Sequence, residues 1–204
     1  MDIRQLIAFC AAALLAGLVV AKCRKKREGQ DSLSVLGSVS GKHHIEMRIK
    51  EYGVIKMELD GNSAPVTVTN FLTLVKRGFY NGLTFHRVVD GFMIQGGDPN
   101  HDGTGGSEQR IKGEFSENGV QNPLSHIRGA VSMARSSGPN SASSQFFIVQ
   151  KDSVQLDGSY AVFGYVTEGM EIVDRICKET KIQNNDGSVE KEDQPVIEEI
   201  TVTD

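Results

Sequence analysis

Two stretches of this 204-residue chain hold most of the residue types that could carry out chemistry. FHRVVDGFMIQGGD (85–98) contains a histidine and an arginine, and SMARSSGPNSASSQFFI (132–148) is rich in serine. Serine hydroxyls paired with His86 or His126 could act as nucleophiles, and the candidates are Ser132, Ser143 and Ser144. No GxSxG turn surrounds any of these serines, and serines among Gly and Asn usually lie in loops. The pattern therefore argues against a hydrolase.

The glycine-rich segment GGDPNHDGTGG (96–106) looks at first like a phosphate-binding loop. It lacks the lysine of a GxxxxGK[ST] motif, and no helix pattern begins directly after it. We expect its glycines to form turns. The five histidines and three cysteines are scattered along the chain without the close spacing of zinc ligands. We therefore expect no metal site.

Together with LDGSYAVFGYVTEGMEIVDRI (156–176), the two stretches resemble the cyclophilin-type peptidyl-prolyl cis-trans isomerases. The resemblance runs from about Ile45 to the C-terminus. It implies a mainly β fold, a closed eight-stranded antiparallel barrel capped by two helices. It also implies an enzyme that accelerates rotation about X–Pro bonds in proline-containing client proteins. That reaction breaks no bond and needs no cofactor.

The residue types of the first stretch suit this reaction. Rotation about an X–Pro bond meets a barrier of about 20 kcal/mol because amide resonance is lost. In the twisted state the proline nitrogen gains a lone pair, so a fixed cation that donates a hydrogen bond towards it lowers the barrier. Arg87 is the candidate, because its guanidinium stays protonated and offers several donors from a rigid plane. The resemblance assigns Gln95 to the peptide carbonyl and counts Phe92 among the catalytic residues.

The proline ring needs an apolar slot, and the resemblance implies that four residues line it: Phe92, Met93, Phe147 and Leu156. Adjacent residues of a strand face opposite sides of the sheet. We therefore expect Phe146 to lie in the core and Phe147 to face the slot. The resemblance places three further residues where the groove meets the peptide backbone: Ala134, Arg135 and Gln145. One extra residue between Met133 and GPN makes the chain more similar to bacterial-type members.

Two positions depart from the family pattern. The tryptophan that many cyclophilins use to bind cyclosporin falls on Gln155, and the chain contains no tryptophan. This replacement argues against tight cyclosporin binding but not against isomerase activity. The family histidine at the slot's rim is replaced by Tyr160, which still supplies an aromatic face and a hydroxyl group.

The patterns along the chain predict the elements that position these residues. Apolar and polar residues alternate over 45–59 around a Tyr-Gly, which predicts a hairpin. A helix of about a dozen residues is expected from Pro65 to Gly78, and a second one over 169–177. Short apolar runs between turn residues predict the remaining strands of an antiparallel closed sheet, and PVIEEITVTD alternates like a final strand.

The N-terminal region has a different character. Residues 6–21 form an unbroken run of sixteen apolar or small residues, followed at once by a basic cluster that ends at 27. Only Arg4 precedes the run, whereas a cleavable signal peptide carries its charge in front. We therefore expect residues 1–27 to be a retained single-pass membrane anchor. Cleavage after Ala21 and lipidation at Cys23 are the alternatives, and Lys22 argues against lipidation.

The basic flank places the following domain on the cytoplasmic side, with an extracytoplasmic or secreted domain as the alternative. Residues 28–42 are rich in Ser and Gly and are expected to form a flexible tether. The isomerase domain is expected to span 43–204.

The N-terminal region and the expected isomerase domain also differ in charge. Residues 1–42 hold seven basic and three acidic residues, whereas 43–204 hold fifteen and twenty-three. With a net charge of -4, the chain has no global basic field, so nucleic acid is not an expected partner.

Two other classes of function fit the sequence: a catalytically weak module that binds Pro-containing segments, and a lipocalin-like barrel for a small apolar ligand. The second would leave Arg87 and Gln95 without a role.

Overall fold

A computed structural model describes residues 38–204. These residues form one eight-stranded sheet in which every paired strand runs antiparallel, in the order β3-β4-β6-β5-β7-β2-β1-β8. The strands are β1 (Lys42–Ile49), β2 (Gly53–Asp60), β3 (Phe85–Val89), β4 (Met93–Gly96), β5 (Ala130–Met133), β6 (Phe146–Val149), β7 (Val162–Glu168) and β8 (Ile197–Val202). The predicted mainly β, eight-stranded antiparallel fold is confirmed.

The two ends of this strand order, β3 and β8, meet just outside the strands themselves. Thr84 and Val196 form an isolated antiparallel bridge. On either side of it, the N–H of Phe85 donates to the carbonyl of Pro195 at 2.9 Å, and the N–H of Ile197 donates to the carbonyl of Leu83 at 2.8 Å. The sheet therefore curls into a barrel whose last seam is a short bridge rather than a continuous ladder.

The hairpin predicted over 45–59 is present as β1 and β2. Its register runs from Lys42 opposite Asp60 to Ile49 opposite Gly53, so the inward-facing apolar residues of the two strands lie side by side. The turn between them needs a left-handed residue, and Glu51 supplies it with a φ of 66°. Successive side chains of a strand point to opposite faces of the sheet, so this register determines which side chains of both strands are buried.

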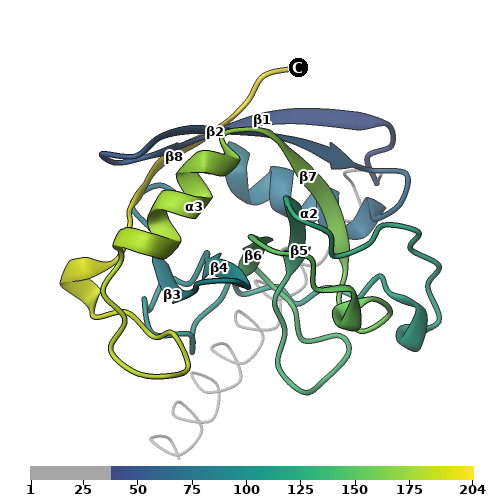
Figure 1. Cartoon of the computed structure of the whole chain (residues 1–204). Coiled ribbons are helices and arrows are strands. Elements are labelled where there is room, and N and C mark those ends of the chain that lie inside the picture. Colours follow the sequence, from purple (N-terminus) through teal and green to yellow (C-terminus); the bar gives the residue numbers. More distant parts are fainter. Residues whose placement is uncertain (1–37) are drawn as a thin grey trace, which may run out of the picture. The chain divides into compact units, whose positions relative to one another are not determined.

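Two helices cover the barrel. Helix α2 (Pro65–Lys76) packs on β8 and β2, and α3 (Met170–Glu179) packs on β2, β3 and β4. Figure 1 shows α3 nearer the viewer and α2 behind it, between the curved walls of the sheet. Both helices were predicted from their apolar spacing. Three 3₁₀ turns complete the structure: η1 (Ser116–Asn118), η2 (Val154–Leu156) and η3 (Lys191–Asp193).

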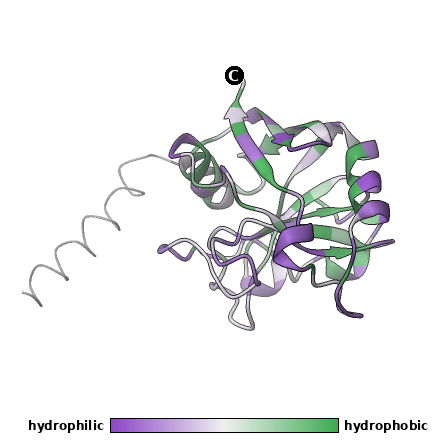
Figure 2. Ribbon diagram, turned by 90° about the vertical axis from the view of Figure 1, so that its left-hand side faces the viewer, coloured by the Kyte–Doolittle hydropathy of each residue, from purple (hydrophilic) through white to green (hydrophobic). Residues whose placement is uncertain are grey.

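The main core fills the space between the sheet and the helices. Four aromatic rings meet in it, with Phe71 of α2 within 5.5 Å of the rings of Tyr80, Phe146 and Phe163. Removing such side chains from water is the dominant favourable term in folding. In Figure 2 the hydrophobic colour gathers on the strands, while connecting loops and outer helix turns are hydrophilic. No helix within 38–204 is both long and apolar enough to cross a membrane.

The expected membrane segment (6–21) and most of the expected tether lie outside the described residues. The folded part begins slightly before the predicted boundary at 43. The N–H of Val39 donates to Thr69 Oγ1 of α2 at 2.9 Å, and β1 begins at Lys42. The last residues assigned to the tether therefore belong to the folded body, because α2 and β2 give their backbone hydrogen-bond partners.

Candidate active site

The sheet separates two sets of side chains on β3, β4, β6 and β5. Inward-facing residues form a row that joins the main core: Val88, Ile94, Ile148 and Val131. The opposite face carries a second row: Arg87, Gln95, Phe147 and Ser132. Phe146 lies in the main core, whereas Phe147 belongs to a separate apolar cluster. The prediction that these neighbours face opposite ways is confirmed.

This separate set, which we call the outer cluster, contains all four residues predicted to line the slot. Its buried members are Met93, Ala130, Phe147, Val149 and Val162. Half-buried side chains pack around them: Val89, Phe92, Leu124, Ala134, Leu156, Tyr160 and Tyr165. The rings of Phe147 and Tyr160 meet edge-on, with centroids 5.9 Å apart. Partly exposed apolar side chains over a buried floor offer a surface that an apolar ring can cover.

Polar groups border the outer cluster along β3 and β4. Arg87 Nη1 donates to Gln95 Oε1 at 3.5 Å, and Gln95 Nε2 donates to Gln145 Oε1 at 2.9 Å. Arg87 and Gln95 are also directly opposite in the sheet, as are Gln95 and Phe147. The half-buried guanidinium, the Gln95 amide and the aromatic ring of Phe147 are thus held side by side by sheet register, and a hydrogen bond adds the Gln145 amide.

The glycine-rich loop supports this polar border. Gln145 Nε2 donates to the carbonyls of Gly103 at 3.0 Å and Gly105 at 2.7 Å. The loop is folded around the buried carboxylate of Asp98, which accepts three backbone N–H groups, those of Asn100, Asp102 and Gly103. Its N–H groups therefore point at its own carboxylate, and the expectation of turns rather than a phosphate cradle agrees with this geometry.

The guanidinium group of Arg135 makes several contacts within the chain, and the expected contact with a peptide stays a prediction. Its Nε donates to the carbonyl of Ser159 at 2.9 Å and its Nη1 to that of Ser136 at 3.1 Å. The guanidinium also lies over the rings of Tyr160 at 4.7 Å and Phe115 at 5.1 Å. The side chain therefore ties three segments of the chain together, and it fixes the ring of Tyr160 at the edge of the outer cluster.

A buried histidine beneath the outer cluster was not among the predicted site residues. The ring of His126 stacks on Phe147, with centroids 5.9 Å apart and planes 12° from parallel, and it meets the edge of Tyr160. Its Nδ1 lies 2.7 Å from Asp157 Oδ1 and its Nε2 lies 3.0 Å from Ser132 Oγ. His126 thus supports both aromatic rings. Nothing in its local sequence signals this, because its partners lie in other segments.

Serine, histidine and aspartate are here arranged like the triad of a hydrolase. Ser132 and His126 are, however, both fully buried behind Phe147. A nucleophile must reach the substrate, and this hydroxyl has no exposed surface. The argument against a hydrolase is supported, and the three residues form a packing support.

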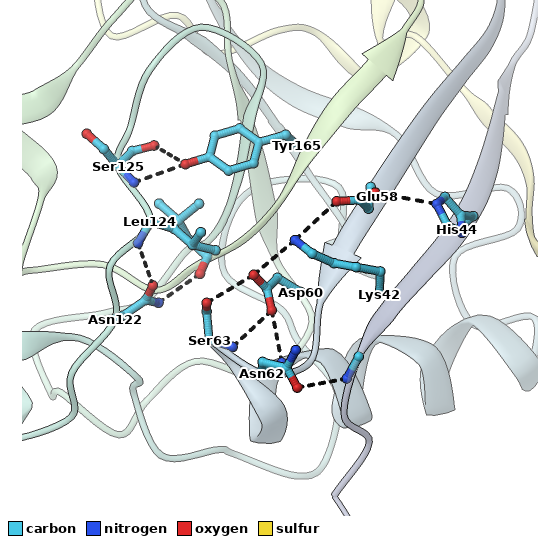
Figure 3. A network of polar contacts seen from close by, with 12 residues as sticks. Lys42, His44, Glu58, Asp60, Asn62, Ser63, Asn122, Leu124, Ser125 and Tyr165 are labelled. Carbon is cyan, nitrogen blue, oxygen red and sulfur yellow. Dashed lines mark hydrogen bonds and ion pairs between the residues drawn. The ribbon is translucent and has the colours of Figure 1, made fainter.

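The segment that carries His126 has no regular structure and is held by polar contacts (Figure 3). The Tyr165 hydroxyl accepts the N–H of Ser125 at 3.0 Å and donates to its carbonyl at 2.9 Å. Asn122 Nδ2 donates to the carbonyl of Val162 on β7 at 2.8 Å. These contacts fix the backbone that leads into His126.

A second residue missed by the sequence interpretation positions Phe92. Gln150, which is buried, accepts the N–H of Gly91 through Oε1 and donates from Nε2 to Asp90 and Asp174 at 3.0 and 3.3 Å. Its backbone N–H donates to the carbonyl of Phe92 at 2.8 Å. The β3–β4 turn is therefore attached to the end of β6 and to α3, and Phe92 is part of this turn.

The buried histidines predict how stability changes with pH. Burial lowers the pKa of His126, against the opposing effect of Asp157, and burial also lowers the pKa of His86, against Asp98 and Asp102. Below the ordinary value of 6.5, the unfolded chain then binds protons that the folded chain does not. The free energy of unfolding should therefore fall as pH decreases from 7 towards 5.5, by at most about 1.4 kcal/mol per pH unit for each histidine.

Urea unfolding at several pH values checks this expectation. The His126→Gln variant should show a shallower fall than the wild type, because one of the two groups is gone. An identical fall in both proteins would contradict a lowered pKa of His126 in the folded state.

Nearly all of the folded part matches a known family. Residues 44–203 match the family model described as cyclophilin type peptidyl-prolyl cis-trans isomerase/CLD. A peptidyl-prolyl cis-trans isomerase of Helicobacter pylori (strain J99 / ATCC 700824) is 48% identical over 126 residues, which cover 61% of this chain and 75% of that protein. Peptidyl-prolyl cis-trans isomerase B of Bacillus subtilis is 44% identical over 134 residues, which cover 63% and 90%.

Solved structures agree with these sequence matches. A Cryptosporidium parvum cyclophilin type peptidyl-prolyl cis-trans isomerase superposes with a TM-score of 0.71 at 29% identity, covering 80% of this chain and 99% of that one. A second structure of that protein was obtained in the presence of the dipeptide Ala-Pro and gives a TM-score of 0.70. The chain belongs to the cyclophilin-type peptidyl-prolyl cis-trans isomerases. It is an isomerase of X–Pro peptide bonds.

Proposed function

We propose that Arg87 is the catalytic cation of this isomerase and that the outer cluster receives the proline ring. The observation that carries the proposal is the single cross-strand row that sets Arg87, Gln95 and Phe147 side by side. A proline ring packed on Phe147 would have its amide next to the guanidinium and the Gln95 amide. Proline-containing polypeptides are the corresponding clients.

The proposed steps need only binding and electrostatic stabilisation. Phe92, Met93, Leu156 and Phe147 exclude water from the ring, and the Gln95 amide holds the peptide carbonyl. As the X–Pro bond twists, an Arg87 N–H donates to the developing lone pair on the proline nitrogen. An acceleration of about a hundred-thousandfold corresponds to about 7 kcal/mol, which a positioned cation, anchored carbonyls and a dry surface can supply together.

NMR measurement of cis-trans exchange in Xaa-Pro peptides tests the activity without a coupled protease. The full chain should accelerate the exchange strongly at catalytic concentration. If the folded chain leaves the exchange rate unchanged in several such peptides yet still binds them, the protein is a binding module and the proposal fails.

Gln155 leads to a prediction about cyclosporin. The side chain lies exposed on η2, one residue before Leu156 of the outer cluster. The family resemblance aligns it with the tryptophan of many cyclophilins. We expect weak cyclosporin binding and a gain of about thirtyfold in affinity for Gln155→Trp, since an aromatic anchor at an interface contributes about 2 kcal/mol. Calorimetry with both proteins measures this. Equal affinities of the two proteins would show that residue 155 does not determine the affinity for cyclosporin.

We further propose that the isomerase is tethered to a membrane by residues 6–21, with the basic cluster and the folded domain on the cytoplasmic side. The support is the length of the apolar run and the five cations that follow it. Residues 28–37 would then act as a spacer that lets the domain reach nearby clients.

Cell fractionation and a compartment-sensitive reporter fused after Asp204 test the tether. The full chain should sediment with membranes and a variant lacking 1–27 should not, with the reporter active in the cytoplasm. Reporter activity only in the extracytoplasmic space would overturn the orientation. Mass spectrometry of the N-terminus distinguishes the retained anchor from cleavage after Ala21 and from a lipid on Cys23.

A further inference from the structure

Arg87 lies on β3, which is an edge of the strand order, so no strand of the sheet flanks it on the outer side. The turn 184–188 takes that place. The N–H of Val88 donates to the carbonyl of Gly187 at 2.8 Å, and Arg87 and Ser188 form an isolated antiparallel bridge. The backbone beside Arg87 is thus paired with a loop from a distant part of the chain.

The same turn also holds the Arg87 side chain. Arg87 Nε donates to the carbonyl of Asp186 at 2.8 Å, a shorter contact than the 3.5 Å between Nη1 and Gln95. A guanidinium held at Nε keeps its plane fixed while its outer nitrogens remain available to a ligand.

The turn is held in shape by its own polar groups. Asp186 Oδ1 accepts the N–H of Ser188 at 2.8 Å and its hydroxyl at 2.6 Å. The N–H of Gly187 donates to the carbonyl of Asn184 at 3.1 Å, and that of Gln183 donates to the carbonyl of Ser188 at 2.7 Å. The carbonyl of Asp186 therefore has a defined direction although Asn184, Asn185 and Asp186 are exposed.

Gly187 is the position where a side chain could not fit. Its φ is +88°, in the left-handed region. A Cβ there would lie 2.5 Å from the carbonyl oxygen of Val88 and 2.5 Å from Val89 Cγ2. The close approach of the turn to β3 depends on the absence of that atom.

We propose that the turn 184–188 positions the guanidinium of Arg87, with Gly187 as the residue that allows its close approach. The inference rests on the proposed function, in which Arg87 is the catalytic cation. The turn would preorganise the site, because a guanidinium that is already aimed at the proline nitrogen loses no rotamer freedom in the transition state.

The Gly187→Ala variant tests the proposal, with Gly119→Ala as a matched control. Gly119 also has a left-handed φ, of 73°, but a Cβ there meets no atom within 4 Å. Two quantities are measured on the full chain: steady-state isomerase kinetics, and the NMR shift and solvent exchange of the Arg87 Nε–H. Gly187→Ala should lower kcat about tenfold with little change in KM, since a displacement of about 1 Å can cost up to a hundredfold. Its Nε–H should exchange faster. Gly119→Ala should keep both wild-type values.

A second pair of variants covers the case in which Gly187→Ala does not fold. Asp186→Ala removes the acceptor that closes the turn, whereas Asp186→Asn retains an acceptor oxygen. Faster Nε–H exchange in the alanine variant alone supports the proposal. Wild-type Nε–H exchange in Asp186→Ala, or in a Gly187→Ala variant that folds, overturns it. The exchange measurement does not depend on catalysis, so it reports on the turn even if Arg87 proves dispensable for the reaction.

Discussion

Replacing Arg87 with alanine is expected to lower kcat/KM for an Xaa-Pro peptide by about 100- to 1000-fold, the usual cost of removing one donor aimed at a developing charge. The guanidinium is half-buried and donates two hydrogen bonds, to the carbonyl of Asp186 and to Gln95 Oε1. Neither contact belongs to the main core, so the variant should remain folded. Line-shape or exchange NMR on the peptide measures the rate, and circular dichroism checks the fold.

Two further substitutions make the result specific. Arg87→Lys keeps the charge but loses the planar donors, so its rate should lie between those of the wild type and the alanine variant. Arg110→Ala removes an exposed arginine outside the site and should leave the rate unchanged. If Arg87→Ala retains the wild-type rate while folded, electrostatic stabilisation by this cation is not the mechanism. The Gln95 amide and the outer cluster would then have to account for the acceleration.

Most of the fold follows from local patterns, because each pattern dictates the face that must be buried. Alternation over 45–59 predicts β1 and β2, and apolar residues at helical spacing after Pro65 predict α2. The same period of two separates Phe146 from Phe147 and so predicts which ring leaves the core. These predictions succeed because neighbouring residues decide them.

The parts of the site that escaped prediction depend on contacts between distant segments. Asp157 lies 31 positions from His126, whose ring it contacts, and His126 lies in a segment without periodicity. The Arg135 side chain donates to the carbonyl of Ser159, 24 positions away, and no local pattern predicts this contact. Asp186 lies 99 positions from the arginine that it orients. The sequence Asn-Asp-Gly (185–187) is typical of a turn, but it does not indicate that the turn contacts Arg87.

A buried carboxylate gives the largest expected effect on stability. Glu114 is 3% exposed and lies at the N-terminus of α2, where its Oε1 accepts the N–H of Val66 at 3.0 Å. Its Oε2 accepts the N–H of Thr67 at 2.8 Å and the Thr67 hydroxyl at 2.6 Å. Helix starts leave N–H groups unpaired, and Ala64 at the N-cap has no side chain to accept them. Glu114 therefore caps α2 from a segment 48 residues away.

Glu114→Ala should lower the free energy of unfolding by about 3 kcal/mol, because hydrogen bonds to a charged group contribute about 1.5–3 kcal/mol and the donors would stay buried. Glu114→Gln should be destabilising as well, since its NH₂ group faces donors. Glu117→Gln, at an exposed position on η1, should change stability by less than about 0.5 kcal/mol. Urea unfolding of the three variants measures the differences.

The size of the Glu114 effect also tests what holds α2 in place. The helix packs on β8 and β2 through its apolar face, and this packing alone could fix it. If Glu114→Ala and Glu117→Gln unfold at the same urea concentration as the wild type, packing suffices and the cap contributes nothing net. If only the Glu114 variants lose stability, the Glu114 carboxylate contributes by accepting hydrogen bonds from helix N–H groups that folding has removed from water. Glu114 also accepts Asn122 Nδ2 at its backbone carbonyl, at 2.9 Å, so the cap and the segment leading to His126 share one anchor.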